Sequence, residues 1–167
     1  MATAAQRHHM HGIMDLLSRY GSQLDYPPHD VRGPLDSRTF NLSEQQMEHV
    51  LAAGGRLMGD CSEFATEICK WAGLADPNGL AYRYAGYTGT MLAHLPHYTD
   101  ARHALTGALA VFGRYPGHHV VLVKEPDAHK GDPLVWSHGR PGVDVVRLSE
   151  MAARQPSPVT LLSIAHL

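Results

Sequence analysis

One short segment constrains the fold more than any other, because it marks a helix start and carries a reactive group. The segment runs from Gly59 to Phe64 and reads Gly-Asp-Cys-Ser-Glu-Phe. Asp60 is a favourable N-cap residue, and Glu63 three positions later completes a capping-box pattern. The pattern therefore predicts that Cys61 occupies the first position of a helix. Apolar residues then recur every three or four positions, which predicts one buried helix face: Phe64, Ala65, Ile68, Cys69 and Ala72.

The predicted position of Cys61 suits a nucleophile. The first turn of a helix has unpaired backbone N–H groups and the positive end of the helix dipole. Both stabilise a thiolate, which is the reactive form of cysteine. The alternative is that Cys61 is a small buried side chain near a helix start. The histidines that follow in the sequence favour the first interpretation.

A cysteine nucleophile needs a base, usually an imidazole, which a third group holds in place. His119 opens the apolar run 119–123, and His138 closes the run 134–138. Both runs have the composition of strands. If the two strands are antiparallel neighbours, His119 and His138 lie at the same end of a sheet. The chain thus contains a nucleophile, a base and an orienting group without a metal ion.

The order of these motifs resembles the NlpC-like cell-wall cysteine peptidases and the related CHAP amidases and peptidases, which share a papain-like core. The matching segments are 60–64, 107–112, 119–123 and 137–139. The last of these, with Arg140 to Gly142 after it, is similar to the catalytic modules of actinobacteriophage lysins of the mycobacteriophage type. Ala108 departs from the family, in which an aspartate is usual. The resemblance covers about Gly59 to Val146.

The resemblance implies that Cys61 is the nucleophile, His119 the base and His138 the orienter. His118 competes with His119, but the family histidine directly precedes the strand, and neighbouring strand residues face opposite sides. His138 could instead be a surface residue at a strand end. The family also has a tyrosine near the nucleophile, for which Tyr26 is the candidate; otherwise Tyr26 is a loop aromatic beside two prolines. The auxiliary or substrate-contacting candidates are Tyr26, Asp60, Ser62, His118 and Ser137.

The remaining cysteine and histidines are assigned no catalytic role. Cys61 and Cys69 are separated by roughly 12 Å along one helix, which is too far for a disulfide. Cys69 is therefore expected in the core, and the compartment is expected to be reducing.

His8, His9 and His11 lie on one amphipathic segment, but the chain lacks a zinc-binding motif. A solvated helix face is the preferred interpretation, and we expect no cofactor or metal. His94, His97 and His103 could line a substrate groove.

Composition indicates a globular chain with one domain. The chain has 167 residues, 44% hydrophobic and 18% charged, and a formal net charge of −2. It has no basic stripe and no membrane-length apolar run, so nucleic-acid binding and membrane insertion are not expected. The N-terminus lacks a signal-peptide core. We therefore expect a protein that stays in a host cytoplasm until release to the wall, with affinity from its groove or from a separate wall-binding domain.

The order of predicted elements indicates an α+β fold with an antiparallel sheet. Helices are expected around residues 13–24, from Ser43, from Cys61 to Gly73, and, as short helices, around 90–94 and 149–154. Residues 26–41 read as a loop. The resemblance implies N-terminal helices and a nucleophile helix packed on a five- to six-stranded sheet, with 1–42 as an extension and 43–167 as a papain-like core of one catalytic domain. The predicted strands are 108–112, 119–124, 134–138, 143–147 and 159–165.

These features together predict a peptidoglycan hydrolase, a cysteine endopeptidase or amidase that cleaves an amide bond of the stem peptide or cross-link through an acyl-enzyme. Three alternatives stay open. The scaffold could serve a non-wall amidase or acyltransferase, it could be a non-catalytic binding or structural phage module, or the histidines could bind a metal in a hydrolase. The sequence does not distinguish among wall bonds or give the oligomeric state.

Overall fold

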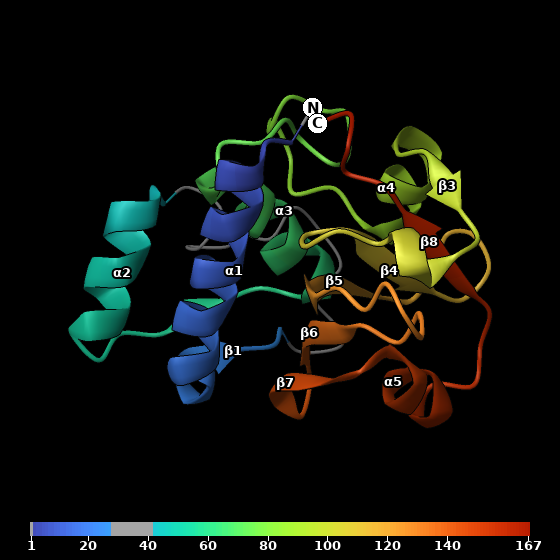
Figure 1. The fold of residues 1–167 in the computed structure, drawn as a ribbon. Helices are drawn as coiled ribbons and strands as arrows, with labels where there is room; N and C mark the ends of the chain where they lie inside the picture. Colours follow the sequence, from blue (N-terminus) through green and yellow to red (C-terminus); the bar gives the residue numbers. More distant parts are fainter. Residues whose placement is uncertain (1, 28–41) are drawn as a thin grey trace.

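The protein is described by a computed structural model, which covers residues 2–27 and 42–167. The predicted loop 26–41 falls mostly outside the described residues. The part of the chain that is described has five α-helices and a six-stranded sheet, which confirms the α+β class (Figure 1). The helices are α1 (Ala4–Arg19), α2 (Glu44–Ala52), α3 (Cys61–Trp71), α4 (Thr88–His94) and α5 (Leu148–Arg154), with two 3₁₀ turns, η1 (Gly21–Gln23) and η2 (Ala101–His103).

The main sheet is antiparallel between all neighbouring strands. Its strands, in spatial order, are β3 (His97–Tyr98), β8 (Val159–Leu162), β4 (Leu109–Phe112), β5 (His119–Glu125), β6 (Leu134–Gly139) and β7 (Gly142–Arg147). Five of these were predicted, with shifts of up to three residues at their ends. β3 and the parallel pair β1 (Leu24–Asp25) and β2 (Leu57–Met58) were not predicted, because a two-residue strand is too short to show alternation.

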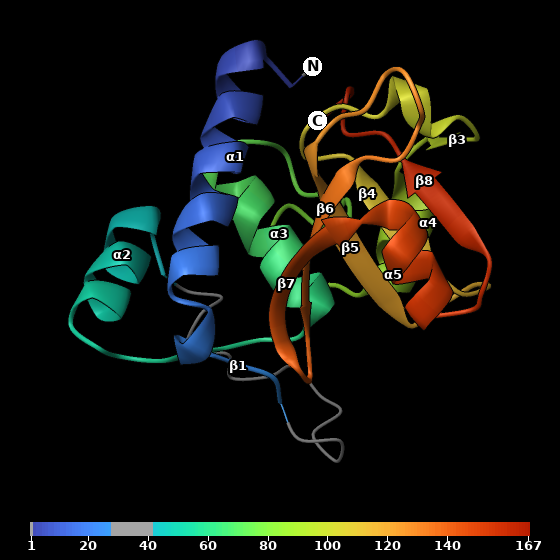
Figure 2. The same cartoon turned by 60° about the horizontal axis from the view of Figure 1, so that its bottom comes forward.

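Side chains alternate between the two faces of the sheet, and each face has its own helical cover. Val120 and Leu122 of β5 pack in the core that contains α1 and α3. Val121 and Val123 pack on the opposite face with Met151 of α5. Figure 2 shows α1 and α3 on one side of the sheet and α5 on the other. This alternation decides which of the candidate site residues share a face.

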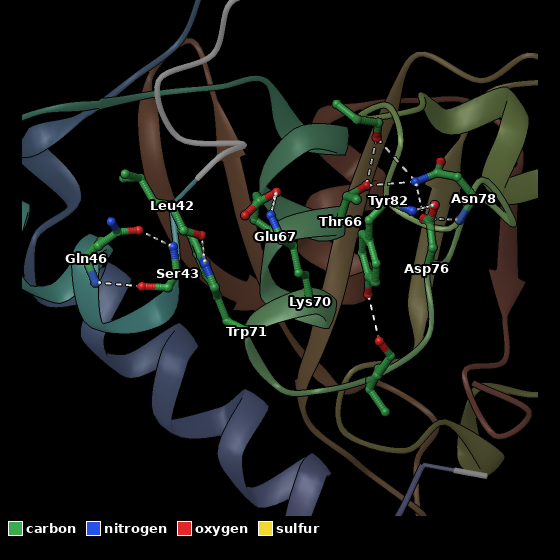
Figure 3. Close-up of polar contacts among 12 residues, drawn as sticks. Leu42, Ser43, Gln46, Thr66, Glu67, Lys70, Trp71, Asp76, Asn78 and Tyr82 are labelled. Carbon is green, nitrogen blue, oxygen red and sulfur yellow. Dashed lines mark hydrogen bonds and ion pairs between the residues drawn. The ribbon is translucent and has the colours of Figure 1, made fainter.

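Helix α3 lies between α1 and the sheet, and ten of its eleven residues are buried. It begins at Cys61, as predicted, and the chain leaves it at Gly73, which has a φ of 71° that favours glycine. The Trp71 indole N–H donates to the carbonyl of Leu42, 3.1 Å away, and so ties the end of α3 to the start of α2 (Figure 3). The capping box of Ser43 and Gln46 begins α2, as predicted.

A buried polar network fixes the loop that follows α3 (Figure 3). The carboxylate of Asp76 accepts the backbone N–H groups of Asn78 at 2.8 Å, Leu80 at 3.0 Å and Tyr82 at 2.9 Å. The Asn78 amide donates to the Thr66 hydroxyl of α3 at 2.9 Å. Tyr82 is in the left-handed region with φ 57°, which is unfavourable for a side chain of this size. The network therefore holds the loop in a conformation that it would not adopt alone.

We expect Asn78→Ala to lower the free energy of unfolding by about 1–3 kcal/mol, because the buried partners of the amide lose their hydrogen bonds. Urea unfolding measures the change. Gln45→Ala, at an exposed position of α2, is the control and should change stability by less than about 0.5 kcal/mol. Equal small effects from both substitutions would show that the network does not stabilise the loop.

Candidate active site

Cys61 lies at the N-terminus of α3, with its helix start held by Asp60. One carboxylate oxygen of Asp60 accepts the backbone N–H groups of Ser62 at 2.8 Å and Glu63 at 2.9 Å. Glu63 accepts the backbone N–H of Asp60 in return at 3.0 Å, so the predicted capping box is complete. The N–H of Cys61 itself makes no hydrogen bond with any residue in 2–27 or 42–167. A free donor thus remains beside the sulfur.

Three donors approach the sulfur of Cys61. The Tyr26 hydroxyl lies 4.0 Å from Sγ and donates to it. The backbone N–H groups of Val120, at the start of β5, and of Ser62 also point to the sulfur. Val120 directly follows His119. The start of α3 and the start of β5 therefore meet at this sulfur, while the His119 side chain lies on the other face of the sheet, with Phe112 and Val121.

The thiol of Cys61 is protonated at neutral pH, contrary to the expectation that the helix start would favour a thiolate. Its pKa is raised to about 12, chiefly by burial and also by the nearby charge of Asp60, against three donors that lower the pKa. Cys61 is only 5% exposed, so the loss of hydration outweighs the helix field. Cys69 lies in the core, as predicted, and both cysteines are free thiols.

His119 hydrogen-bonds to Ser137 across the β5–β6 hairpin. The distance from its Nε2 to Ser137 Oγ is 2.8 Å, and both side chains are buried. In the tautomer that donates Nε2–H to the hydroxyl, the lone pair lies on Nδ1. Nδ1 makes no hydrogen bond within the described part of the chain. His119 is therefore oriented through one nitrogen and has the other available as a base.

His138 does not hydrogen-bond to His119; it fixes the segment before Cys61. Its Nε2 donates to the carbonyl of Gly59 at 3.1 Å and, more weakly, to that of Asp25 at 3.4 Å. Its ring stacks edge-on against Phe64, with 4.7 Å between centroids, and is fully buried. The orienting contact predicted for His138 is thus made by Ser137, the preceding residue. The reason is the pleat, which places neighbouring strand residues on opposite faces.

A pocket of about 410 Å³ opens beside this cluster. His119, Ser137 and Tyr26 line it; Cys61 does not, and adjoins it only through Tyr26, whose hydroxyl contacts the sulfur. His118 also lines the pocket but is exposed, which distinguishes it from the buried His119. The remaining lining residues come from the β6–β7 turn, β7 and α5: Gly139, Arg140, Pro141, Gly142, Asp144, Met151, Arg154 and Gln155.

His119 is neutral at physiological pH. Its pKa is lowered from 6.5 to about 4, chiefly by burial and also by the neighbouring His118 and His138, against the opposing effect of Asp60. Burial also lowers the pKa of His138. The resting site therefore has a neutral thiol and a neutral imidazole. The two groups make no hydrogen bond to each other within residues 2–27 and 42–167, so a proton that passes from sulfur to nitrogen needs a bridging water or substrate group.

The other histidines singled out in the sequence lie away from the pocket. His8 and His9 are exposed on α1, and His9 pairs with Glu44 of α2. His94 and His97 are exposed near α4 and β3 and do not line the pocket. Within residues 2–27 and 42–167, no three His, Cys, Asp or Glu side chains converge to hold a metal ion. No described helix is both long and apolar enough to cross a membrane.

Two features of the site were missed in the sequence. The sequence places Ser137 only among the auxiliary residues. The available signal was that Ser137 and His138 are neighbours in one strand, because one of two neighbouring strand residues must share a face with His119. Arg140 was part of the segment that carries the resemblance, yet it received no role. Its guanidinium lies over the Tyr26 ring, with 5.6 Å from Cζ to the ring centroid. This contact joins residues more than a hundred positions apart, so neither local sequence pattern indicates it.

Comparison with protein-family models, with curated proteins and with solved structures finds no match for this chain. The assignment of a function consequently depends on the chemistry of the site and on the resemblance in motifs.

We expect the free energy of unfolding to fall as the pH is lowered from 7 to 5. Between pH 6.5 and about 4 the unfolded chain binds a proton at His119 that the folded chain does not, so acid favours unfolding. His119 alone should contribute about 2 kcal/mol at pH 5. Urea unfolding at both pH values measures this.

His119→Gln should show a smaller pH dependence than the wild type, because glutamine does not titrate. His8→Gln removes an exposed histidine of α1 and serves as the control, with an unchanged pH dependence. An identical pH dependence in His119→Gln and the wild type would contradict a buried, neutral His119.

Proposed function

We propose that the protein is a cysteine-dependent amide hydrolase that cleaves the peptide part of bacterial peptidoglycan. The observation that carries the proposal is the meeting of the Cys61 helix start with β5, where His119 is held by Ser137 beside an open pocket. This set supplies a nucleophile, a base and an orienting group. The resemblance to cell-wall peptidases and amidases supports the wall substrate.

The reaction begins when the Cys61 sulfur attacks the amide carbonyl carbon. His119 Nδ1 takes the thiol proton through a bridging water as the carbon–sulfur bond forms, so no free thiolate has to exist beforehand. The oxyanion would accept hydrogen bonds from two donors, the backbone N–H of Cys61 and the Tyr26 hydroxyl. The Asp60 cap leaves the Cys61 N–H unused. His119 then donates its proton to the amine nitrogen as the carbon–nitrogen bond breaks, which leaves a thioester. Water, activated by His119, hydrolyses the thioester and restores the thiol.

Ser137 and His138 have different supporting roles in this scheme. Ser137 orients the imidazole through Nε2, so that Nδ1 presents its lone pair. His138 holds Gly59, two residues before the nucleophile, and thereby positions the helix start. His138 is fully buried, so it is not available to substrate.

We expect Cys61→Ala to abolish wall digestion while the protein still folds, because it removes the nucleophile and only one heavy atom from a site that keeps slight exposure. Digestion of purified peptidoglycan, with mass spectrometry of the new termini, measures activity and identifies the bond. Cys69→Ala is the matched control: it should keep activity and lose stability, since Cys69 is fully buried in the core. Equal digestion by wild type and Cys61→Ala would rule out thiol catalysis.

We expect His119→Ala to abolish activity and Ser137→Ala to lower kcat by roughly 10- to 100-fold, a part of the ~10²- to 10⁴-fold that general acid–base catalysis contributes, because the base remains but is no longer oriented. His118→Ala is the control for a neighbouring exposed imidazole and should change kcat little. His138→Gln should mainly lower the melting temperature. A larger loss of kcat in His138→Gln than in His119→Ala would transfer the base role to His138.

A further inference from the structure

Arg140 lines the pocket, and no carboxylate of residues 2–27 or 42–167 pairs with it. It is exposed in the turn between β6 and β7, and it lines the pocket together with His119 and Ser137. Its guanidinium carbon is 5.6 Å from the ring centroid of Tyr26. The hydroxyl of the same ring donates to the Cys61 sulfur. One tyrosine therefore links the cation to the nucleophile.

The carboxylates around Arg140 already have partners. Asp144 of the pocket and Glu150 of α5 both bond to Arg154. Asp25, one residue before Tyr26, accepts both arms of the Arg56 guanidinium at 2.7 Å.

Asp60 is likewise engaged, in the α3 cap. Among residues 2–27 and 42–167, Arg140 forms no ion pair or hydrogen bond of its own. Its five N–H donors are thus free to bind a ligand.

We propose that Arg140 binds a carboxylate of the substrate, on the residue that adjoins the scissile amide. The proposal rests on the proposed function and adds the chemical class of the substrate: a peptide with a free side-chain or α-carboxylate next to the cleaved bond. The cation lies over the face of the tyrosine ring whose hydroxyl contacts the sulfur, which suits a group on the neighbouring residue and not on the reacting carbonyl.

An arginine suits this role better than a lysine would. The planar guanidinium can hold a carboxylate through two parallel hydrogen bonds, and it can lie against an aromatic ring at the same time. The Tyr26 ring limits the orientations of the Arg140 side chain before substrate binds, so less conformational entropy is lost on binding. Arg154, the other arginine of the pocket, is not available in this way because two carboxylates occupy it.

The test uses two synthetic stem peptides that differ at one position, a carboxylate or a carboxamide on the residue adjoining the scissile amide. We expect the wild type to prefer the carboxylate peptide by about 10- to 100-fold in kcat/KM, the range of a charge-assisted hydrogen bond. Arg140→Gln should remove the preference, and Arg140→Lys should retain part of it. Arg114→Gln, an exposed arginine of the β4–β5 turn outside the pocket, should keep it in full.

Two results would overturn the assignment of Arg140 and leave the hydrolase proposal intact. One is an equal loss of kcat/KM on both peptides in Arg140→Gln, and the other is a wild type that cleaves both peptides equally well. If the wild type cleaves neither peptide nor wall, the hydrolase proposal fails and the site is tested by binding alone. Calorimetry with the Cys61→Ala protein then compares the two peptides. Tighter binding of the carboxylate form that Arg140→Gln removes supports the site, and equal or absent binding of the two forms overturns it.

Discussion

The placement of the α3 N-terminus at the edge of the sheet is the constraint on which the candidate site depends. Two contacts fix it. The Asp60 carboxylate binds the first backbone N–H groups of the helix, and His138 holds the carbonyl of Gly59 just before it. The His138 contact is buried and the Asp60 contacts are partly buried, where a hydrogen bond is hard to replace with water. Together they hold Cys61 beside the backbone N–H of Val120.

Burial gives this site its electrostatic character. The Cys61 thiol and the His119 imidazole both have pKa values displaced toward their neutral forms, the thiol to about 12 and the imidazole to about 4. An ion pair at rest would require two hydrated charges to be taken out of water. A neutral pair avoids that cost and creates charge only during attack, when the N–H of Cys61 and the Tyr26 hydroxyl can stabilise the oxyanion.

Ser137 and His138 are neighbours in β6, and their side chains serve different purposes on opposite faces of the sheet. Ser137 points to the face of His119 and bonds to it, while His138 points to the face of α3 and supports the helix start. A strand can do both because its side chains alternate with a period of two. The wider chemistry of the pocket arises in the same way, since the turn after β6 brings Arg140 over Tyr26.

The sequence by itself determined the local features. The capping pairs at Asp60 and Ser43, the period of the α3 apolar face and five of the strands could all be predicted, because each depends on residues a few positions apart. Only the tertiary structure decided which side chains meet. The partner of His119 depends on the register of β5 against β6, and a shift of one residue exchanges Ser137 for His138. The protonation of Cys61 depends on burial by distant segments, which a local motif does not specify.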